Sequence, residues 1–162
     1  YLLGLLNSKL LNFWFFKVYL NDDKLFPHIQ KNQLESIPLI TSKEEFIQPI
    51  SRLVDYLIWV SSEERQNVIS HTTNDRIGKH LEDVLNMLVF ELYFEEYMKE
   101  KEIDVLNYIN EKFDKTVNQS IEEEIKDFYL WLQTPNNQVR QRINIIDVKS
   151  PDILSKINLA MR

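Results

Sequence analysis

The chain has very few residues that let a backbone turn sharply. Only two of its 162 residues are glycine, Gly4 and Gly78, and five are proline. A sheet protein of this length needs many tight turns, and glycine is the residue that most readily adopts the positive φ angles of those turns. Hydrophobic residues still make up 44% of the chain, which is enough to bury a core. The composition therefore predicts long helices joined by polar loops.

Apolar residues recur at helical spacing through most of the chain. The clearest pattern lies in residues 81–92, where six apolar side chains would share one face of a helix. These are Leu81, Val84, Leu85, Leu88, Val89 and Leu92. We expect this face to lie at the centre of the core.

Start signals for other helices come from pairs of polar residues three positions apart. Ser42 and Glu45 have the spacing of a capping box ahead of a helix that contains Pro49, and Ser120 and Glu123 have the same spacing ahead of another helix. Proline lacks a backbone N–H, so Pro49 should kink the first of these helices or mark a restart of the helical pattern. Both pairs predict a helix N-terminus.

The two ends of the chain predict further helices. Residues 1–20 are apolar on nearly every side, which predicts one helix buried against several neighbours. Because the chain enters this pattern directly at Tyr1, we expect an upstream part of a longer protein to supply some of the neighbours that cover this helix. Ser150 and Pro151 are expected to be the N-cap and first residue of the last helix. The predicted fold is mainly α, a helical bundle-like domain with at most one short strand near residues 37–40.

Several kinds of site are excluded by residues that the chain lacks. It has no cysteine, which excludes disulfides and thiolate metal sites and agrees with a cytoplasmic location. The longest apolar run of the opening segment, 13–16, is far shorter than a membrane span. Two isolated glycines cannot form a phosphate-binding loop, and His71 and His80 lack the spacing of metal ligands. We therefore expect no catalytic residue, metal or cofactor in this chain.

Acidic charge is concentrated in residues 81–134, where 14 carboxylates and five lysines give a net charge of −9. Such a run most often marks a solvated face. A nuclease centre built from these acidic helices is the less favoured alternative.

A polar connection, "FPHIQKNQLESIPLI" (Phe26–Ile40), and Lys24 just before it hold the candidate DNA contacts. Asparagine and glutamine pair with adenine through two hydrogen bonds, and lysine contacts guanine or phosphate. The alternative is that the apolar residues of this loop pack it down while its polar residues face water. Residues 136–142 form a rival polar and basic cluster. The candidate contacts are Lys24, His28, Gln30, Lys31 and Asn32.

Several stretches, in order, resemble one family. "YLLGLLNSKLLNFWF" (Tyr1–Phe15) and the polar connection resemble the end of a target recognition domain in restriction–modification proteins: a helix with a Leu-Asn-Ser motif, a loop, a Gln-Leu pair and an Ile-Pro close. "LNMLVFELYFEEYMKEKEID" (Leu85–Asp104) resembles their Leu-Val-Tyr-Glu-Leu-Tyr-Phe signature, with Phe90 in place of the usual tyrosine. "DFYLWLQTPNNQVRQRI" and "SPDI" are similar to the extreme C-terminus of adenine-N6 methyltransferases and fused restriction–methylation enzymes with a TaqI-like specificity region.

The resemblance implies a division of labour. Residues 1–40 would be the end of the target recognition domain, 41–70 a connecting helix and 71–162 a helical C-terminal extension. Catalysis and S-adenosylmethionine would belong to a missing N-terminal methyltransferase, possibly fused to an endonuclease. The implied partners are double-stranded DNA and those catalytic domains. The alternative is a purely structural helical module that docks the catalytic domains without touching DNA.

Overall fold

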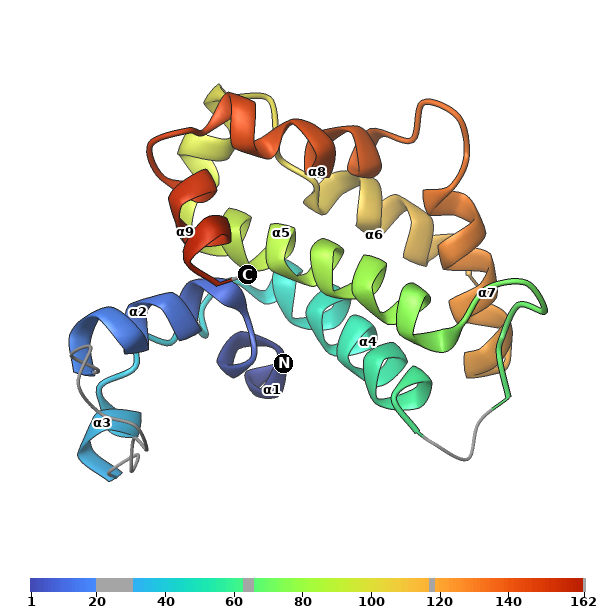
Figure 1. Cartoon of the computed structure of the whole chain (residues 1–162), viewed down its shortest axis with the longest axis horizontal. Helices are drawn as coiled ribbons and strands as arrows, with labels where there is room; N and C mark the ends of the chain where they lie inside the picture. Colours follow the sequence, from blue (N-terminus) through green and yellow to red (C-terminus); the bar gives the residue numbers. More distant parts are fainter. Residues whose placement is uncertain (20–30, 63–65, 117–118, 162) are drawn as a thin grey trace.

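The computed structural model describes residues 1–19, 31–62, 66–116 and 119–161 (Figure 1). In these residues all regular secondary structure is helical, which confirms the predicted fold class, and residues 37–40 form no strand. None of the described helices is long and apolar enough to cross a membrane. The helices are α1 (Leu2–Leu6), α2 (Lys9–Tyr19), α3 (Lys31–Glu35), α4 (Glu44–Val60), α5 (Asn74–Glu100), α6 (Leu106–Asp114), α7 (Ile121–Leu132), α8 (Gln138–Lys149) and α9 (Leu154–Ala160).

The centre of the molecule is the pair α4 and α5, which run antiparallel along each other (Figure 1). All six residues of the predicted face 81–92 are at most 4% exposed. The facing side of α4 buries Phe46, Ile50 and Leu53 completely. Burying a side chain of this size stabilises the fold by about 1.5–3 kcal/mol, so this pair dominates the core.

The remaining helices pack around this pair. α6, α7 and α8 cover one side, where α7 and α8 contact α5 and α6 contacts α4. On the other side α1 packs on α4, and α2 contacts both α5 and α9 (Figure 1). α5 is kinked at Phe94, whose φ of −124° and ψ of 37° are not helical. Through the contact between α2 and α9, the C-terminal helix packs against the N-terminal part of the chain.

The opening segment differs from the single helix predicted for residues 1–20. It forms two helices, α1 and α2, which are separated at Asn7 and Ser8. The Ser8 hydroxyl accepts a hydrogen bond from the Leu11 N–H at 3.3 Å, so Ser8 acts as the cap of α2. The single-helix prediction was wrong because this serine satisfies a backbone donor that would otherwise continue α1.

Of the two predicted capping boxes, one is confirmed. The Ser120 hydroxyl accepts from the Glu123 N–H and the Glu123 carboxylate accepts from the Ser120 N–H, at the start of α7. At α4 the prediction was wrong, because the helix begins after Lys43 and has no side-chain cap. The Lys43 side chain instead crosses to α5 and donates to the Leu92 carbonyl. The start of α4 is therefore held by a tertiary contact to α5, and its first N–H groups have no side-chain cap.

The last helix begins later than predicted. Ser150 ends α8, and α9 starts at Leu154 after a turn. The Ser150 hydroxyl is buried, pairs with the Tyr97 hydroxyl at 2.8 Å and accepts from the Leu154 N–H at 3.0 Å. Ser150 therefore joins two helices to α5, and it is not the N-cap of α9.

Candidate nucleic-acid interface

The region that carries the predicted DNA contacts projects from the packed helices. We call the outer part of α2 (residues 13–19) together with α3 the arm (Figure 1). The base of α2 is fixed, since Leu10 and Leu11 are buried and the Lys9 N–H donates to Asn86 Oδ1 at 2.8 Å. Beyond this base, residues 16–18 are exposed, and α3 has no buried residue. The arm therefore presents most of its surface to solvent.

Two of the five predicted contacts lie in the described residues. Lys31 and Asn32 form the first turn of α3 and are both exposed. Lys31 Nζ lies 3.5 Å from Glu35 Oε1, but the two side chains are 89% and 64% exposed. Such an ion pair contributes less than about 1 kcal/mol, so it leaves Lys31 free to turn to a phosphate. Lys24, His28 and Gln30 lie outside the described residues.

Three aromatic side chains contact one another at the outer end of α2, and the hydroxyl of one of them reaches the residue after α3. The Tyr19 ring lies 5.8 Å from that of Trp14 and 5.3 Å from that of Phe15, between centroids. The Tyr19 hydroxyl is hydrogen-bonded to the Ser36 hydroxyl just after α3. Edge and tilted ring contacts of this kind add about 0.5–1.5 kcal/mol beyond the area that they bury. The arm therefore has a small internal cluster of its own.

The rival cluster at residues 136–142 is engaged in contacts between helices. Arg140 Nη1 donates to Gln133 Oε1 at 2.6 Å, which ties α8 to the end of α7. Arg142 lies 4.5 Å over the Tyr108 ring and donates to its hydroxyl at 3.0 Å, which ties α8 to α6. Both arginines already join helices, so we rank them below Lys31 as candidate contacts.

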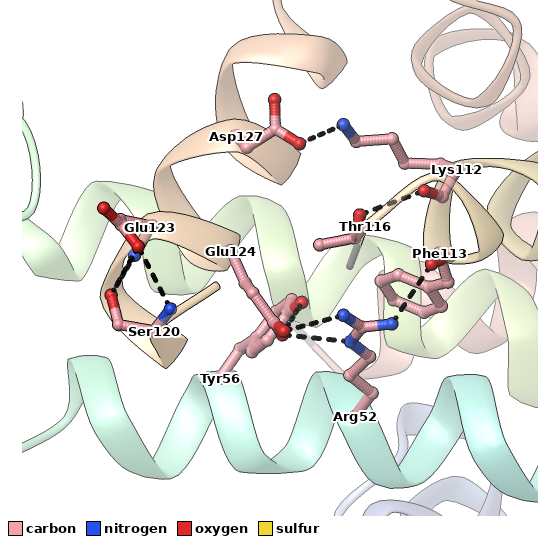
Figure 2. Close-up of polar contacts among 9 residues, drawn as sticks. All are labelled: Arg52, Tyr56, Lys112, Phe113, Thr116, Ser120, Glu123, Glu124 and Asp127. Atoms are coloured by element: carbon pink, nitrogen blue, oxygen red, sulfur yellow. Dashed lines mark hydrogen bonds and ion pairs between the residues drawn. The ribbon is translucent and has the colours of Figure 1, made fainter. Parts of the chain in front are cut away.

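The acidic segment also contains side chains that join helices (Figure 2). Glu124 Oε1 lies 2.9 Å from Arg52 Nη2, and Glu124 Oε2 accepts from the Tyr56 hydroxyl at 2.8 Å. Burial and this bond to Glu124 raise the pKa of Tyr56 well above its ordinary value. The Arg52 guanidinium also lies 4.7 Å over the Phe113 ring. This network fastens α7 and α6 to α4.

A second carboxylate caps a helix from a distance. Glu91 is 2% exposed, and its Oε2 accepts from the backbone N–H groups of Val105 and Leu106 at 2.5 and 2.9 Å. Burial raises the pKa of Glu91, while these two hydrogen bonds oppose that rise. Glu91 belongs to the 88–94 signature, so this motif residue closes the N-terminus of α6. Within the described ranges no three His, Asp or Glu residues are placed to hold a metal ion.

The two histidines of the described residues differ in their surroundings. His71 is exposed. His80 lies against Tyr129, with ring centroids 5.6 Å apart, and burial lowers the pKa of His80. A low pKa keeps this ring neutral near pH 7, in agreement with a packing role.

Sequence reasoning missed the network around Arg52. Its acidic partner, Glu124, lies on a distant helix and has no sequence signal of its own. A signal was present on α4, however, since Arg52 and Tyr56 are four residues apart and share a face next to the buried Leu53. An arginine beside an apolar helix stripe needs a partner, which is what the structure supplies.

An apolar groove of about 570 Å³ lies between α1, α4 and α5. Its lining includes Leu3, Gly4, Leu57 and Ile58, and Leu3 and Ile58 are 51% and 58% exposed. The groove shows that α1 leaves part of its apolar surface uncovered.

Residues 1–39 match the family model of the TaqI-like C-terminal specificity domain. This match spans α1, α2, α3 and all five predicted contact residues. It confirms the resemblance for the N-terminal part of the chain. Comparison with curated proteins and with solved structures gave no match.

Proposed function

We propose that the chain is the DNA target-recognition and scaffold part of a type II restriction–methylation protein. The observation that carries this proposal is that the range matched to a specificity domain contains the arm, which projects from the packed helices. The match to a specificity domain covers residues 1–39, and the arm, which exposes Lys31 and Asn32, lies within this range. Their side chains suit a phosphate or guanine and an adenine edge, respectively.

Charge supports an approach of DNA from the side of the arm. Residues 81–134 carry −9, and a phosphate backbone repels such a segment. Arg140 and Arg142 are engaged with neighbouring helices, as described above. Lys24, His28 and Gln30 remain predicted contacts on the strength of their residue types and of their place in the matched range.

The finer proposal concerns the protein to which this part belongs. It is a cytoplasmic, site-specific adenine methyltransferase, in which a separate catalytic domain binds S-adenosylmethionine and transfers the methyl group. An endonuclease domain in the same polypeptide is compatible with this proposal. The chain itself contributes recognition and support, without a catalytic residue of its own.

The groove between α1 and α4 favours a second candidate function. Leu3 and Ile58 are half-exposed apolar residues beside a cavity large enough for side chains of another domain. Here the chain docks catalytic domains and makes no contact with DNA. The two candidates differ in one measurable property, which is the binding of DNA by the chain itself.

Fluorescence anisotropy of the purified chain with a pool of duplexes tests the proposal. The double variants Lys31→Ala/Asn32→Ala and Gln30→Ala/Lys31→Ala should bind more weakly. A lost phosphate contact should reduce the salt slope by about 1, whereas a lost base contact should cost about 1–3 kcal/mol and relax preference at one position. Matched controls are Lys126→Ala and Asn107→Ala, which change exposed residues of α7 and α6.

Two results would contradict the proposal. One is the absence of salt-dependent binding by the unaltered chain, which favours the scaffold function. The other is unchanged binding by both arm variants together with a loss in Arg140→Ala and Arg142→Ala, which would place the DNA on α8.

A further inference from the structure

The segment between α3 and α4 is held to the packed helices by side chains from outside it. We call residues 37–43 the strap. The Tyr93 hydroxyl donates to the Pro38 carbonyl at 2.6 Å, and the Tyr1 hydroxyl donates to the Ile40 carbonyl at 2.5 Å. Both carbonyls belong to a stretch without helical hydrogen bonding, so these tyrosines satisfy acceptors that no local structure serves.

The end of the strap is fixed by a charged residue. Lys43 Nζ donates to the Leu92 carbonyl at 3.2 Å and lies 2.5 Å from Glu95 Oε2. Glu95 also pairs with Lys99 at 2.7 Å, and hydrogen bonds from both lysines hold the pKa of Glu95 below its ordinary value. A carboxylate held ionised in this way keeps Lys43 in place over the physiological pH range.

The anchors that α5 supplies lie close together on that helix. Leu92, Tyr93 and Glu95 surround Phe94, where α5 departs from helical geometry. A side chain that bonds a helix carbonyl is a common cause of such a kink. The strap therefore reaches α5 at the point where α5 changes direction.

The position of α3 depends on this attachment because α3 buries little surface of its own. No residue of α3 is buried, and the hydrogen bond between Tyr19 and Ser36 joins it to α2. After the C-terminus of α3, the chain continues through Ser36 into the strap. Two connections, the end of α2 and the strap, thus fix where α3 lies.

We propose that Tyr1, Tyr93 and the Lys43–Glu95 pair form a clamp that sets the orientation of α3 against the packed helices. The clamp residues are positioning residues that act through the strap and do not themselves touch DNA. The consequence for DNA reading rests on the proposed function. A base contact needs a side chain placed within about 0.5 Å, so a loosened α3 would lose discrimination between sequences before it lost all affinity.

The competing explanation is simple packing. Ile37 and Ile40 are partly buried against the core, so the strap is also held by apolar contacts. If these contacts suffice, removing the hydroxyls and the charge lowers stability slightly and leaves α3 where it is. The two explanations therefore differ in the position of α3.

A distance measurement separates them without any DNA. The chain has no cysteine, so spin labels can be attached solely at Leu34→Cys on α3 and Glu96→Cys on α5, both exposed positions. The clamp variant combines Tyr1→Phe, Tyr93→Phe and Glu95→Gln. We expect a narrow distance distribution in the parent and a broader one in this variant. The matched control is Tyr97→Phe, which removes a hydroxyl of α5 that is bonded to Ser150 and not to the strap.

The second readout is the ratio of affinities for a selected duplex and a scrambled duplex. Loss of the two tyrosine hydrogen bonds should lower this ratio, by at most about fivefold for each bond. The salt slope should stay unchanged because no phosphate contact is removed. The control should keep both its distance distribution and its ratio.

Each outcome decides a separate question. An unchanged distance distribution in the clamp variant overturns the clamp, whether or not the chain binds DNA. A broader distribution with an unchanged affinity ratio overturns the role of the clamp in reading. If the parent chain binds no DNA, the proposed function fails, and the distance distribution alone decides on the clamp.

Discussion

The packed helices and the arm use the same kinds of residue in opposite ways. In the packed helices, charged side chains such as Arg52, Glu91 and Glu124 are buried or half-buried and bonded to other helices. In the arm, Lys31 and Asn32 are exposed, and the ion pair of Lys31 is weak. Residue type alone therefore does not mark an interface.

This difference indicates which charged residues are able to bind DNA. A buried ion pair that loses one partner leaves an uncompensated charge, so its members cannot serve a ligand without a large loss of stability. An exposed lysine loses little when it changes partner. The comparison therefore predicts large stability effects in the packed helices and small ones in the arm.

The largest effect is expected at the centre of the core. Leu88→Ala removes a fully buried side chain and should lower the free energy of unfolding by about 2–5 kcal/mol, measured by urea denaturation. The control Val148→Ala changes a side chain that is 80% exposed and should stay within about 0.5 kcal/mol. A loss under about 1 kcal/mol for Leu88→Ala would show that α5 is not tightly packed.

The next effect concerns the buried carboxylate of Glu91. Glu91→Ala leaves the Val105 and Leu106 N–H groups without their acceptor, and an unpaired buried donor costs about 1–3 kcal/mol. Glu91→Gln keeps a carbonyl acceptor and should cost less than Glu91→Ala. Equal losses in thermal unfolding of the two variants would argue that these hydrogen bonds contribute nothing.

The same residue gives a pH dependence with a defined sign. Burial raises the pKa of Glu91 above its ordinary value of 4.5, so the folded state favours the protonated form. The stability of the parent relative to Glu91→Gln should therefore increase as the pH falls from 7 through the folded-state pKa. Thermal unfolding of both proteins from pH 7 to pH 4 measures this, and a constant difference would contradict it.

Smaller effects on the free energy of unfolding, opposite in sign, are expected from alanine substitutions at the two glycines. A Cβ on Gly4 would lie 2.8 Å from Ile50 Cγ2 and 2.9 Å from Val54 Cγ2, so Gly4→Ala should push α1 from α4 and cost about 1 kcal/mol. At Gly78 the nearest atom would be 3.6 Å away, so Gly78→Ala should stabilise α5 by up to about 1 kcal/mol. The same sign for both would mean that α1 is not held closely to α4.

The smallest effect on stability is expected in the arm. Phe16→Ser and Lys31→Ala alter exposed side chains and should each change the free energy of unfolding by less than about 0.5 kcal/mol. Losses as large as those in the packed helices would remove the distinction between the two regions. DNA affinity of Lys31→Ala should fall all the same.

Helix faces and local caps were predictable where the sequence itself holds the signal. The face of α5 follows from periodicity, and the Ser120–Glu123 box from a spacing of three residues. The prediction failed at Ser42 and Ser150, because Lys43 and Tyr97 make contacts there with residues about fifty positions away. Local rules cannot include such partners.

The exposure of Lys31 and Asn32 was predictable from the sequence, but the contacts that hold the segment after α3 were not. The residue types of Lys31 and Asn32 marked an exposed polar stretch, and the structure exposes both. The hydrogen bonds of Tyr1 and Tyr93 to the strap had no signal, since a tyrosine in an apolar pattern is indistinguishable from a core residue. Which hydroxyl meets which carbonyl depends on the packing of helices that are distant in sequence.

The contact between α2 and α9 has a consequence for how the chain is made. α2 lies at Lys9–Tyr19 and α9 at Leu154–Ala160, so nearly the whole domain is synthesised between them. Released chains that end at residue 150 lack α9 and should be cleaved by trypsin after Lys9 faster than the 162-residue chain. At roughly 5–20 residues per second, α2 waits on the order of ten seconds for its partner. During that delay its apolar side chains are open to chaperones and to other nascent chains, so α2 is fully packed only after α9 has been made.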